Sequence, residues 1–200
     1  MTHLRDLLVG IVNGRRGHFV MESGYHSEWW FNLDVLFDDT ARLQPFVDAL
    51  AHQLQRHDVE VICGPMSGGA KLATLLGETM ARPATFSERF ESPDATGMFP
   101  VRYVIPPNQR AGLVGKRVAI VDDAVSAGSA VRGTYADLVK CGARPIVIGA
   151  LFIFGQAGEQ FAAENKMGVE AIARLPLEIW RPEECPHCRA GEPLEVVSAP

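Results

Sequence analysis

Two adjacent carboxylates followed by a loop of small residues form the part of this chain that is best suited to chemistry. Four apolar residues, Val118–Val121, lead into Asp122 and Asp123, and a loop from Ala124 to Ser129 precedes a predicted helix. Small residues allow the backbone to approach a ligand closely, and amides at a helix N-terminus favour an anion. The carboxylates suit the hydroxyl groups of a sugar or a magnesium-bound sugar. The pattern therefore predicts a site for a phosphorylated sugar.

The competing interpretation of this segment is an ordinary strand–turn–helix corner with a serine at the helix N-cap. A corner of that kind does not require two acids directly before a loop of such small residues. We therefore favour the sugar phosphate site over the plain corner.

A second loop of small residues follows another predicted strand. The segment Gly64–Gly69 comes directly after Cys63, and its residues Ser67, Gly68 and Gly69 open a predicted helix. A glycine pair at a helix N-terminus allows backbone amides to face an anion, although such a pair often forms only a tight turn. In combination with the first loop, the segment predicts a second anion site.

The two loops need a sheet that brings their strands side by side. Apolar runs predict strands at residues 18–21, 29–33, 59–63, 84–88, 118–121 and 146–154, and apolar residues at helical spacing predict helices at 4–13, 40–55, 68–80, 131–141 and 156–166. From residue 40 onward, helices and strands alternate, which favours an α/β fold with a parallel sheet covered on both faces. Because ligands bind at the carboxyl ends of such strands, the loops after Cys63, Glu88 and Asp123 should meet at one edge.

The segment from Arg89 to Lys116 interrupts this alternation. It contains four prolines, three glycines and a stretch, 97–105, that alternates like a strand. We interpret residues 89–116 as a two-stranded excursion that forms a lid, because it leaves the sheet where the ligand should bind. The alternative is a surface hairpin without a role in function.

Composition limits the class of protein. The chain has 200 residues, of which 47% are hydrophobic and 22% are charged, so one globular domain with a substantial core is expected. Its formal net charge of -5 argues against a nucleic acid partner. No apolar run reaches the length of a membrane span, and the N-terminus lacks the pattern of a secretory signal. We therefore expect a cytoplasmic protein without a membrane partner.

Two of the four cysteines form a Cys-x-x-Cys pair. Cys63 and Cys141 fall in predicted core elements and are expected to be packing residues. Cys185 and Cys188 have the spacing of half a zinc site. A complete site needs two more ligands, and the sequence has no second cysteine pair, although His187 or a second copy of the chain could contribute. We therefore favour a structured turn over zinc for this pair.

The Asp122 segment resembles the signature for 5-phosphoribosyl diphosphate (PRPP) in type I phosphoribosyltransferases. Residues 17–32 resemble the opening of orotate phosphoribosyltransferases, where a Ser-Gly turn leads to an aromatic pair and an Asn. The resemblance extends through Gly64-Pro65 to the C-terminal Cys-Pro-x-Cys motif of a bacterial and archaeal subgroup, and it covers most of the chain. It implies one type I phosphoribosyltransferase domain, 1–200, with a parallel twisted sheet flanked by helices. Residues 1–36 and 168–200 would form a hood.

The resemblance also implies roles for individual residues. Asp122 and Asp123 would hold the ribose hydroxyls and, indirectly through PRPP, a magnesium ion. The residues implied for the 5-phosphate are Ala124, Val125, Ser126, Ala127, Gly128 and Ser129, and those implied for the diphosphate are Ser67, Gly68 and Gly69. In this family, such a site transfers phosphoribosyl from PRPP to a base.

The base and the lid have their own candidates. Trp30 and Phe31 stand where the family has an aromatic wall for the base, and the alternative is that they belong to the core. His26 is a further candidate for the base, against the alternative of a solvent-facing turn. Arg89 or Arg102 would supply the cation of the lid, and with the aspartates they complete the expected catalytic set.

Several positions depart from the family pattern. Glu22 replaces a lysine before the Ser-Gly turn, Gly68 stands where many members have a lysine, and the lid has no lysine before Lys116. The stretch Leu151–Gly155 is uncharged where an Asp-Arg pair contacts the acidic base in the family. Burying the carboxylate of orotate without a cation would cost several kcal/mol, so another arginine must supply the contact or the base differs.

Three functions follow from these observations. The first is transfer of phosphoribosyl between PRPP and orotate, which yields orotidine 5'-phosphate in pyrimidine nucleotide biosynthesis. The second is the same reaction with a purine or another neutral base. The third is a regulator that binds PRPP without turnover, as the missing lysines suggest. Family members are commonly homodimers that share the active site, so a homodimer is expected, and the neighbouring chain could supply the missing cation.

Overall fold

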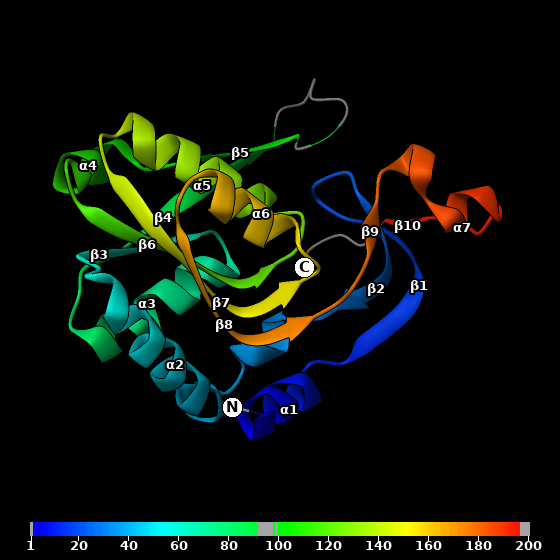
Figure 1. Cartoon of the computed structure of the whole chain (residues 1–200), viewed down its shortest axis with the longest axis horizontal. Helices are drawn as coiled ribbons and strands as arrows, with labels where there is room; N and C mark the ends of the chain where they lie inside the picture. Colours follow the sequence, from blue (N-terminus) through cyan, green and yellow to red (C-terminus); the bar gives the residue numbers. More distant parts are fainter. Residues whose placement is uncertain (1, 92–97, 99, 197–200) are drawn as a thin grey trace.

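The computed structural model describes residues 2–91, 98 and 100–196, which form two sheets flanked by helices (Figure 1). The main sheet has six strands in the order β5-β4-β3-β6-β7-β8. Its strands, in chain order, are β3 (Val61–Pro65), β4 (Ala84–Glu91), β5 (Val101–Val104), β6 (Arg117–Val125), β7 (Arg144–Phe154) and β8 (Gly168–Leu175). All pairs are parallel except the pair of β4 with β5. The predicted α/β fold with a parallel sheet is confirmed.

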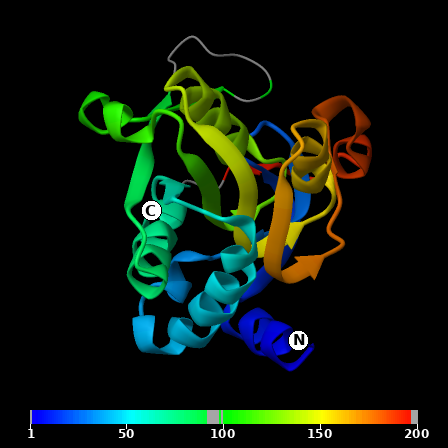
Figure 2. The same ribbon diagram turned by 60° about the vertical axis from the view of Figure 1, so that its left-hand side comes forward.

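Helices cover both faces of the main sheet (Figures 1 and 2). One face carries α2 (Thr40–Leu54) and α3 (Gly68–Met80), and the other carries α5 (Ser129–Lys140) and α6 (Ala157–Glu164). The N-terminal helix α1 (Thr2–Ile11) also packs on the α2 side, where its Leu8 is buried. No helix among the described residues is both long enough and apolar enough to cross a bilayer.

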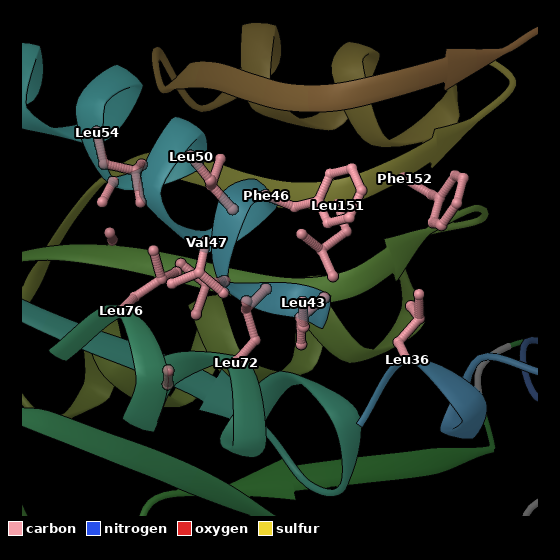
Figure 3. Packing of buried hydrophobic residues seen from close by; sticks show 14 of the residues in the cluster. Leu36, Leu43, Phe46, Val47, Leu50, Leu54, Leu72, Leu76, Leu151 and Phe152 are labelled. Carbon is pink, nitrogen blue, oxygen red and sulfur yellow. The ribbon is translucent and has the colours of Figure 1, made fainter. Parts of the chain in front are cut away.

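The core on the α2 side follows from helical spacing in the sequence. On α2, apolar residues recur every three or four positions, which places them along one side of the helix. Leu43, Phe46, Val47, Leu50 and Leu54 are all buried there. Figure 3 shows this row together with Leu72 and Leu76 of α3 against Leu151 and Phe152 of β7.

The core on the opposite face follows from the alternation of side chains along the strands. Successive residues of a strand point to opposite faces of a sheet. Along β6, Val118 and Ile120 therefore pack with Val131 and Leu138 of α5, whereas Ala119 packs on the α2 side. Because both faces are covered, the central strands β6 and β7 contain long buried apolar runs, Val118–Val121 and Val147–Phe154, as the sequence indicates.

The strand order reverses direction between β3 and β6. From β3 the chain crosses through α3 to β4 on one side, whereas β6 lies on the other side of β3 and leads through α5 to β7. The loops that leave the carboxyl ends of β3 and β6 therefore diverge to opposite faces. A crevice opens between such loops, and this is where α/β sheets of this kind bind ligands.

A second, four-stranded sheet has the order β10-β1-β2-β9. Its strands β1 (Gly14–Val20) and β2 (His26–Phe31) form a hairpin, and β9 (Ile179–Trp180) and β10 (Glu195–Val196) come from the other end of the chain. Figure 1 shows this sheet beside the main one, next to the short helix α7 (Pro186–Arg189).

The residues expected in the hood are thus divided between the two sheets. β8 pairs along its length with β7 in the main sheet, and α1 packs on the main core. The sequence assigned both to the hood because it contains no signal that separates a strand at the edge of a large sheet from one in a small sheet. Among the described residues, only the segments 14–31 and 179–196 contribute strands to the small sheet.

The segment 89–116 has two structural parts. Its first part is antiparallel, with Arg89 opposite Tyr103, while residues 92–97 and 99 of the expected lid lie outside the described residues. Its second part contains the short helix α4 (Pro107–Arg110) and packs on the domain, because Ile105 and Leu113 are buried. The two-stranded excursion is therefore shorter than the sequence predicted.

Replacement of Leu50 with alanine tests the α2 core. Leu50 is fully buried between α2 and the sheet, so its truncation should lower the free energy of unfolding by about 2–5 kcal/mol. The matched variant Leu7→Ala removes a side chain that is 50% exposed on α1 and should change stability by less than about 0.5 kcal/mol. Urea denaturation measures both, and equal losses would contradict this assignment of the core.

Candidate active site

Asp122 and Asp123 occupy the last part of β6, which continues past them to Val125. Asp122 is only 7% exposed, and its Oδ1 accepts a hydrogen bond of 3.1 Å from the amide of Asp123. The Oδ1 of Asp123 accepts a hydrogen bond of 2.8 Å from the amide of Ala124. These bonds to the backbone fix the orientation of both carboxylates at the carboxyl end of the strand.

The loop after β3 lies directly against these carboxylates. A Cβ atom on Gly68 would collide with the carboxylate of Asp123, and one on Gly69 would come within 2.8 Å of Oδ1 of Asp122. A Cβ atom on Gly64 would collide with the carbonyl of Gly69. Glycine is therefore required here by close packing, and the two predicted anion loops are in contact through the aspartates.

The loop after β6 turns sharply into α5. Gly128 has a φ of +78°, a left-handed conformation that glycine adopts without strain, and it directly precedes the first residue of α5, Ser129. Two residues of this segment, Val125 and Ala127, have buried side chains. The N-terminus of α5 therefore opens toward the same crevice as the loop after β3, and its amides favour an anion.

Both loops line one cavity of about 340 Å³. The lining includes Ser67, Gly68, Asp122, Asp123 and every residue from Ala124 to Ser129, so the structure brings these predicted site residues together. Gly69 lies behind this wall, where it allows the close approach to Asp122. The cavity is closed on the other side by residues 21–23 and 30–34, which belong to the β1–β2 turn and the end of that hairpin.

The cavity is strongly acidic for a site that should bind phosphates. Glu22, Asp34, Asp122 and Asp123 line it, and no lysine or arginine stands among its described lining residues. Burial raises the pKa of Asp122 well above its usual range, and the charges of Asp123 and Glu22 raise it further. Burial and the charge of Asp34 also raise the pKa of Asp123. Each carboxylate therefore costs free energy when ionised in the free protein.

Glu22 is the least expected member of the site. Its carboxylate accepts hydrogen bonds from Arg89 Nε at 2.8 Å, from the hydroxyl of Tyr103 at 2.8 Å and from Ser129 Oγ at 3.3 Å. Burial and the charge of Glu22 raise the pKa of Tyr103, so that its hydroxyl stays protonated and donates. Glu22 thus joins the β1–β2 turn to the β4–β5 pair and to the loop before α5.

The two candidate lid cations lie on opposite faces of the β4–β5 pair. Arg89 is opposite Tyr103 in the antiparallel register, and both reach Glu22. Arg102 is opposite Phe90, the residue after Arg89. Its side chain therefore points to the face of the strand pair opposite that of Arg89. Arg89 is therefore the cation next to the cavity, where it also forms an ion pair with Glu91.

A second cavity of about 250 Å³ adjoins the first, and Trp30 and Phe31 line both. The ring of Phe31 is stacked on that of Phe154, with centroids 5.0 Å apart. The other lining residues are mainly apolar, with Leu33 and Leu177 among them, and the described lining has no lysine or arginine. Trp30 and Phe31 therefore lie where the two cavities adjoin, and Phe31 also packs on Phe154.

Three comparisons relate this geometry to known proteins. No family model matches the chain. An orotate phosphoribosyltransferase of Thermus thermophilus is 30% identical over 183 residues, which are 90% of this chain and 92% of that protein. The chain belongs to the orotate phosphoribosyltransferase family. A second member, from Thermotoga maritima, is 28% identical over 90% of this chain and 88% of its own.

Solved structures agree with this family on the fold. The crystal structure of the orotate phosphoribosyltransferase from Aeropyrum pernix matches with a TM-score of 0.62 at 20% identity, over 87% of this chain and 92% of that chain. An adenine phosphoribosyltransferase from Trypanosoma brucei matches with a TM-score of 0.67 at 11% identity, over 86% of this chain and 79% of that chain. The type I phosphoribosyltransferase fold expected from the sequence is therefore confirmed.

His26 lies away from both cavities. It is 5% exposed in β2, and its Nδ1 is 3.0 Å from Nε2 of His18 and 3.3 Å from Sγ of Cys188. His26 is therefore neither beside the second, aromatic cavity nor in a solvent-facing turn, because β2 directs it toward the C-terminal segment. Cys63, in contrast, is a packing residue as expected, and burial raises the pKa of its thiol.

Sequence reasoning missed Glu22, Asp34 and Tyr103 as cavity residues. The only signal for Glu22 was its departure from the lysine of the family pattern. Tyr103 lies 81 positions from Glu22 and gave no signal, because their contact arises from the pairing of β5 with β4. Asp34 follows the hairpin in a single 3-10 turn, whose position beside the cavity depends on the tertiary fold.

Replacement of Gly68 with alanine tests the contact between the loop and the carboxylate. The added Cβ must displace Asp123, so the affinity for PRPP, the ligand that the sequence predicts, should fall about 100-fold. Titration calorimetry with magnesium present measures it. Gly112→Ala is the matched control, because nothing lies within 4 Å of its added Cβ. Wild-type affinity in Gly68→Ala would contradict the proposed geometry.

Replacement of Asp122 with asparagine should stabilise the ligand-free protein at neutral pH. A carboxyl whose pKa is raised by folding loses stability as pH rises above its unfolded value, near 3.9. The variant should therefore match the wild type near pH 4 and exceed its free energy of unfolding increasingly toward neutral pH. Urea denaturation across this range measures the gap, with the exposed Asp48→Asn as the control. A gap that narrows as pH rises would contradict the prediction.

Proposed function

We propose that this protein transfers the 5-phosphoribosyl group from PRPP to orotate, which yields orotidine 5'-phosphate and diphosphate. The bond between C1 of the ribose and the diphosphate oxygen breaks, a bond from C1 to a ring nitrogen of orotate forms, and that nitrogen loses its proton. One observation carries the proposal: the loops after β3 and β6 converge on Asp122 and Asp123 in a single cavity next to an aromatic one. Family membership supports orotate as the base.

Three groups of residues in the cavity bind the ribose, the 5-phosphate and the diphosphate of PRPP. Asp122 and Asp123 accept hydrogen bonds from the ribose hydroxyls. The loop from Ala124 to Ser129 and the N-terminus of α5 bind the 5-phosphate through backbone amides. The diphosphate binds to Ser67, Gly68 and the N-terminus of α3. Gly69 allows this loop to pack close to Asp122. This division holds C1 of the ribose between the diphosphate loop and the aromatic cavity.

The donor set of the cavity suits magnesium. Oxygen ligands are those that this ion prefers, and Glu22, Asp34, Asp122 and Asp123 supply four carboxylates. PRPP adds further negative charge to a cavity whose described lining contains no cationic side chain. Asp122 and Asp123 would hold the ion indirectly, through the ribose hydroxyls. When bound, magnesium neutralises the charge that develops on the leaving diphosphate.

Arg89 is the protein's own candidate for the lid cation. Its Nε pairs with Glu22 and its Nη1 with Glu91, so its charge is balanced by two carboxylates at the rim of the cavity. A diphosphate in the cavity would compete with Glu22 for this guanidinium. Transfer through an oxocarbenium-like state needs charge stabilisation more than acid–base chemistry, so a cation at this position contributes where charge develops.

One observation favours a different acceptor. Orotate carries a carboxylate, yet the described lining of the aromatic cavity has no lysine or arginine, and β7 is apolar where the family has an Asp-Arg pair. A neutral purine would need no cation there. A regulator that binds PRPP without turnover remains the third candidate, which the missing lysines of the sequence support.

Turnover with a choice of bases distinguishes these functions. Purified protein with PRPP and magnesium should consume orotate, as measured by the loss of its ultraviolet absorbance, and should leave adenine unchanged. The double variant Asp122→Asn/Asp123→Asn should lose at least about 100-fold in kcat/KM, whereas Asp48→Asn on α2 should keep wild-type activity. Turnover of adenine alone would overturn orotate as the base, and PRPP binding without turnover of either base would favour the regulator.

The assembly and the cellular location stay predictions. A homodimer whose partner contributes a cation to the base cavity would supply the contact that one chain lacks. A cytoplasmic location fits a biosynthetic enzyme that uses PRPP.

A further inference from the structure

We propose that His18, His26, Cys185 and Cys188 form a tetrahedral zinc site that fastens the C-terminal segment to the β1–β2 hairpin. Their ligand atoms all lie within 4.8 Å of one another, although the two pairs are about 160 positions apart in the chain. The site is separate from both cavities described above, since none of these four residues lines either one.

The distances between the donor atoms match those around a tetrahedral zinc ion. Bonds of about 2.0–2.1 Å to nitrogen and about 2.3 Å to sulfur imply roughly 3.3 Å between two nitrogens and roughly 3.6 Å between nitrogen and sulfur. His18 Nε2 is 3.0 Å from His26 Nδ1, 3.4 Å from Cys185 Sγ and 3.6 Å from Cys188 Sγ. Cys188 Sγ is 3.3 Å from His26 Nδ1. An ion at the centre would contact all four atoms with small shifts.

The surroundings of His18 direct a lone pair into the cluster. Its Nδ1 is 3.0 Å from the carbonyl oxygen of Glu192, which only accepts, so the ring proton belongs on Nδ1. Nε2 is then unprotonated and faces the nitrogen of His26 and the two thiols. A histidine that ligates a metal commonly donates its other N–H to a carbonyl in this way. Hydrogen bonds alone pair these four atoms poorly, because a thiol is a weak donor.

Burial supports a structural site over a chance cluster on the surface. His18 is 3% exposed, His26 is 5% exposed and Cys185 is fully buried, while Cys188 is exposed at the rim. Four protein ligands without an open position are typical of structural zinc sites and atypical of catalytic ones. The Cys-x-x-Cys motif supplies two ligands from one turn. The other two, His18 and His26, come from the two strands of the β1–β2 hairpin.

The C-terminal segment has little else to hold it. Cys185 is the only buried residue between positions 181 and 196, and the pairing of β10 with β1 involves two residues on each strand. A segment with so small a core usually needs a metal or a disulfide to stay in place. A zinc ion at this position would attach the segment to both strands of the hairpin.

The site would also position the active-site turn. His18 and His26 flank the turn that carries Met21, Glu22 and Ser23, which line the first cavity. Cross-linking the two strands below this turn restricts its movement. Loss of the metal should therefore loosen the turn as well as the C-terminal segment.

Metal analysis and cobalt substitution of the wild-type protein test the proposal without any variant. Protein purified under reductant and dialysed against a weak chelator should retain about one zinc per chain. After removal of zinc and addition of Co²⁺, absorption spectra should show the visible bands of tetrahedral cobalt and the charge-transfer bands of cobalt–thiolate bonds. Protein that takes up neither ion, or an octahedral cobalt spectrum, would overturn the proposal. A disulfide between Cys185 and Cys188 in the freshly purified protein would overturn it as well.

Variants locate the ion. Cys188→Ser should lose the metal, lower the Tm and increase proteolysis after residue 181, whereas Cys141→Ser should retain one zinc per chain and the wild-type Tm. Cys188→Ser has an exposed position and should still fold, which circular dichroism verifies. Equal zinc content in Cys188→Ser and the wild type would assign the ion to another place and overturn the site. These readouts do not depend on which base the enzyme uses.

Discussion

The contact between Gly68 and the carboxylate of Asp123 is the constraint on which the rest of the site depends. It holds the buried carboxylate of Asp122 and the half-buried carboxylate of Asp123 between the loops of β3 and β6, where the strand order reverses. Burial raises the pKa values of both aspartates, and the charges of Asp123 and Asp34 add to this for Asp122 and Asp123 respectively, so the ligand-free protein carries an electrostatic cost at this point. The tightly packed main sheet tolerates this cost, because two apolar cores stabilise it from opposite faces. Binding groups that are strained before the ligand arrives are common in active sites.

The described lining of the cavity is acidic and has no lysine or arginine, so the positive charge that an anionic substrate needs must come from other groups. Backbone amides at the N-termini of α3 and α5 supply partial positive charge. In the proposed reaction, magnesium bound with the substrate would supply more. Arg89 is the cation that the fold places at the rim, and it is shared among Glu22 and Glu91. Glu22 thereby couples the small sheet to the β4–β5 pair.

The small sheet has a different physical basis from the main one. Two of its four strands are only two residues long, and its C-terminal part is nearly all exposed. Hydrophobic burial therefore contributes little to this C-terminal part, whose one buried residue, Cys185, lies against His18 of β1. Trp30 and Phe31 of this sheet line both cavities, so the stability of the small sheet affects the shape of the site.

The sequence by itself determined the α/β alternation, the strand with its acidic end, both loops of small residues and the aromatic pair, because these features depend on neighbouring residues and on short periodicities. Tertiary structure decided which distant residues meet. Glu22 reaches Tyr103 through strand pairing, His26 turns toward Cys188 and lines neither cavity, and β8 joins the main sheet. None of these contacts leaves a local pattern in the chain, because each depends on packing between segments that lie far apart in the sequence.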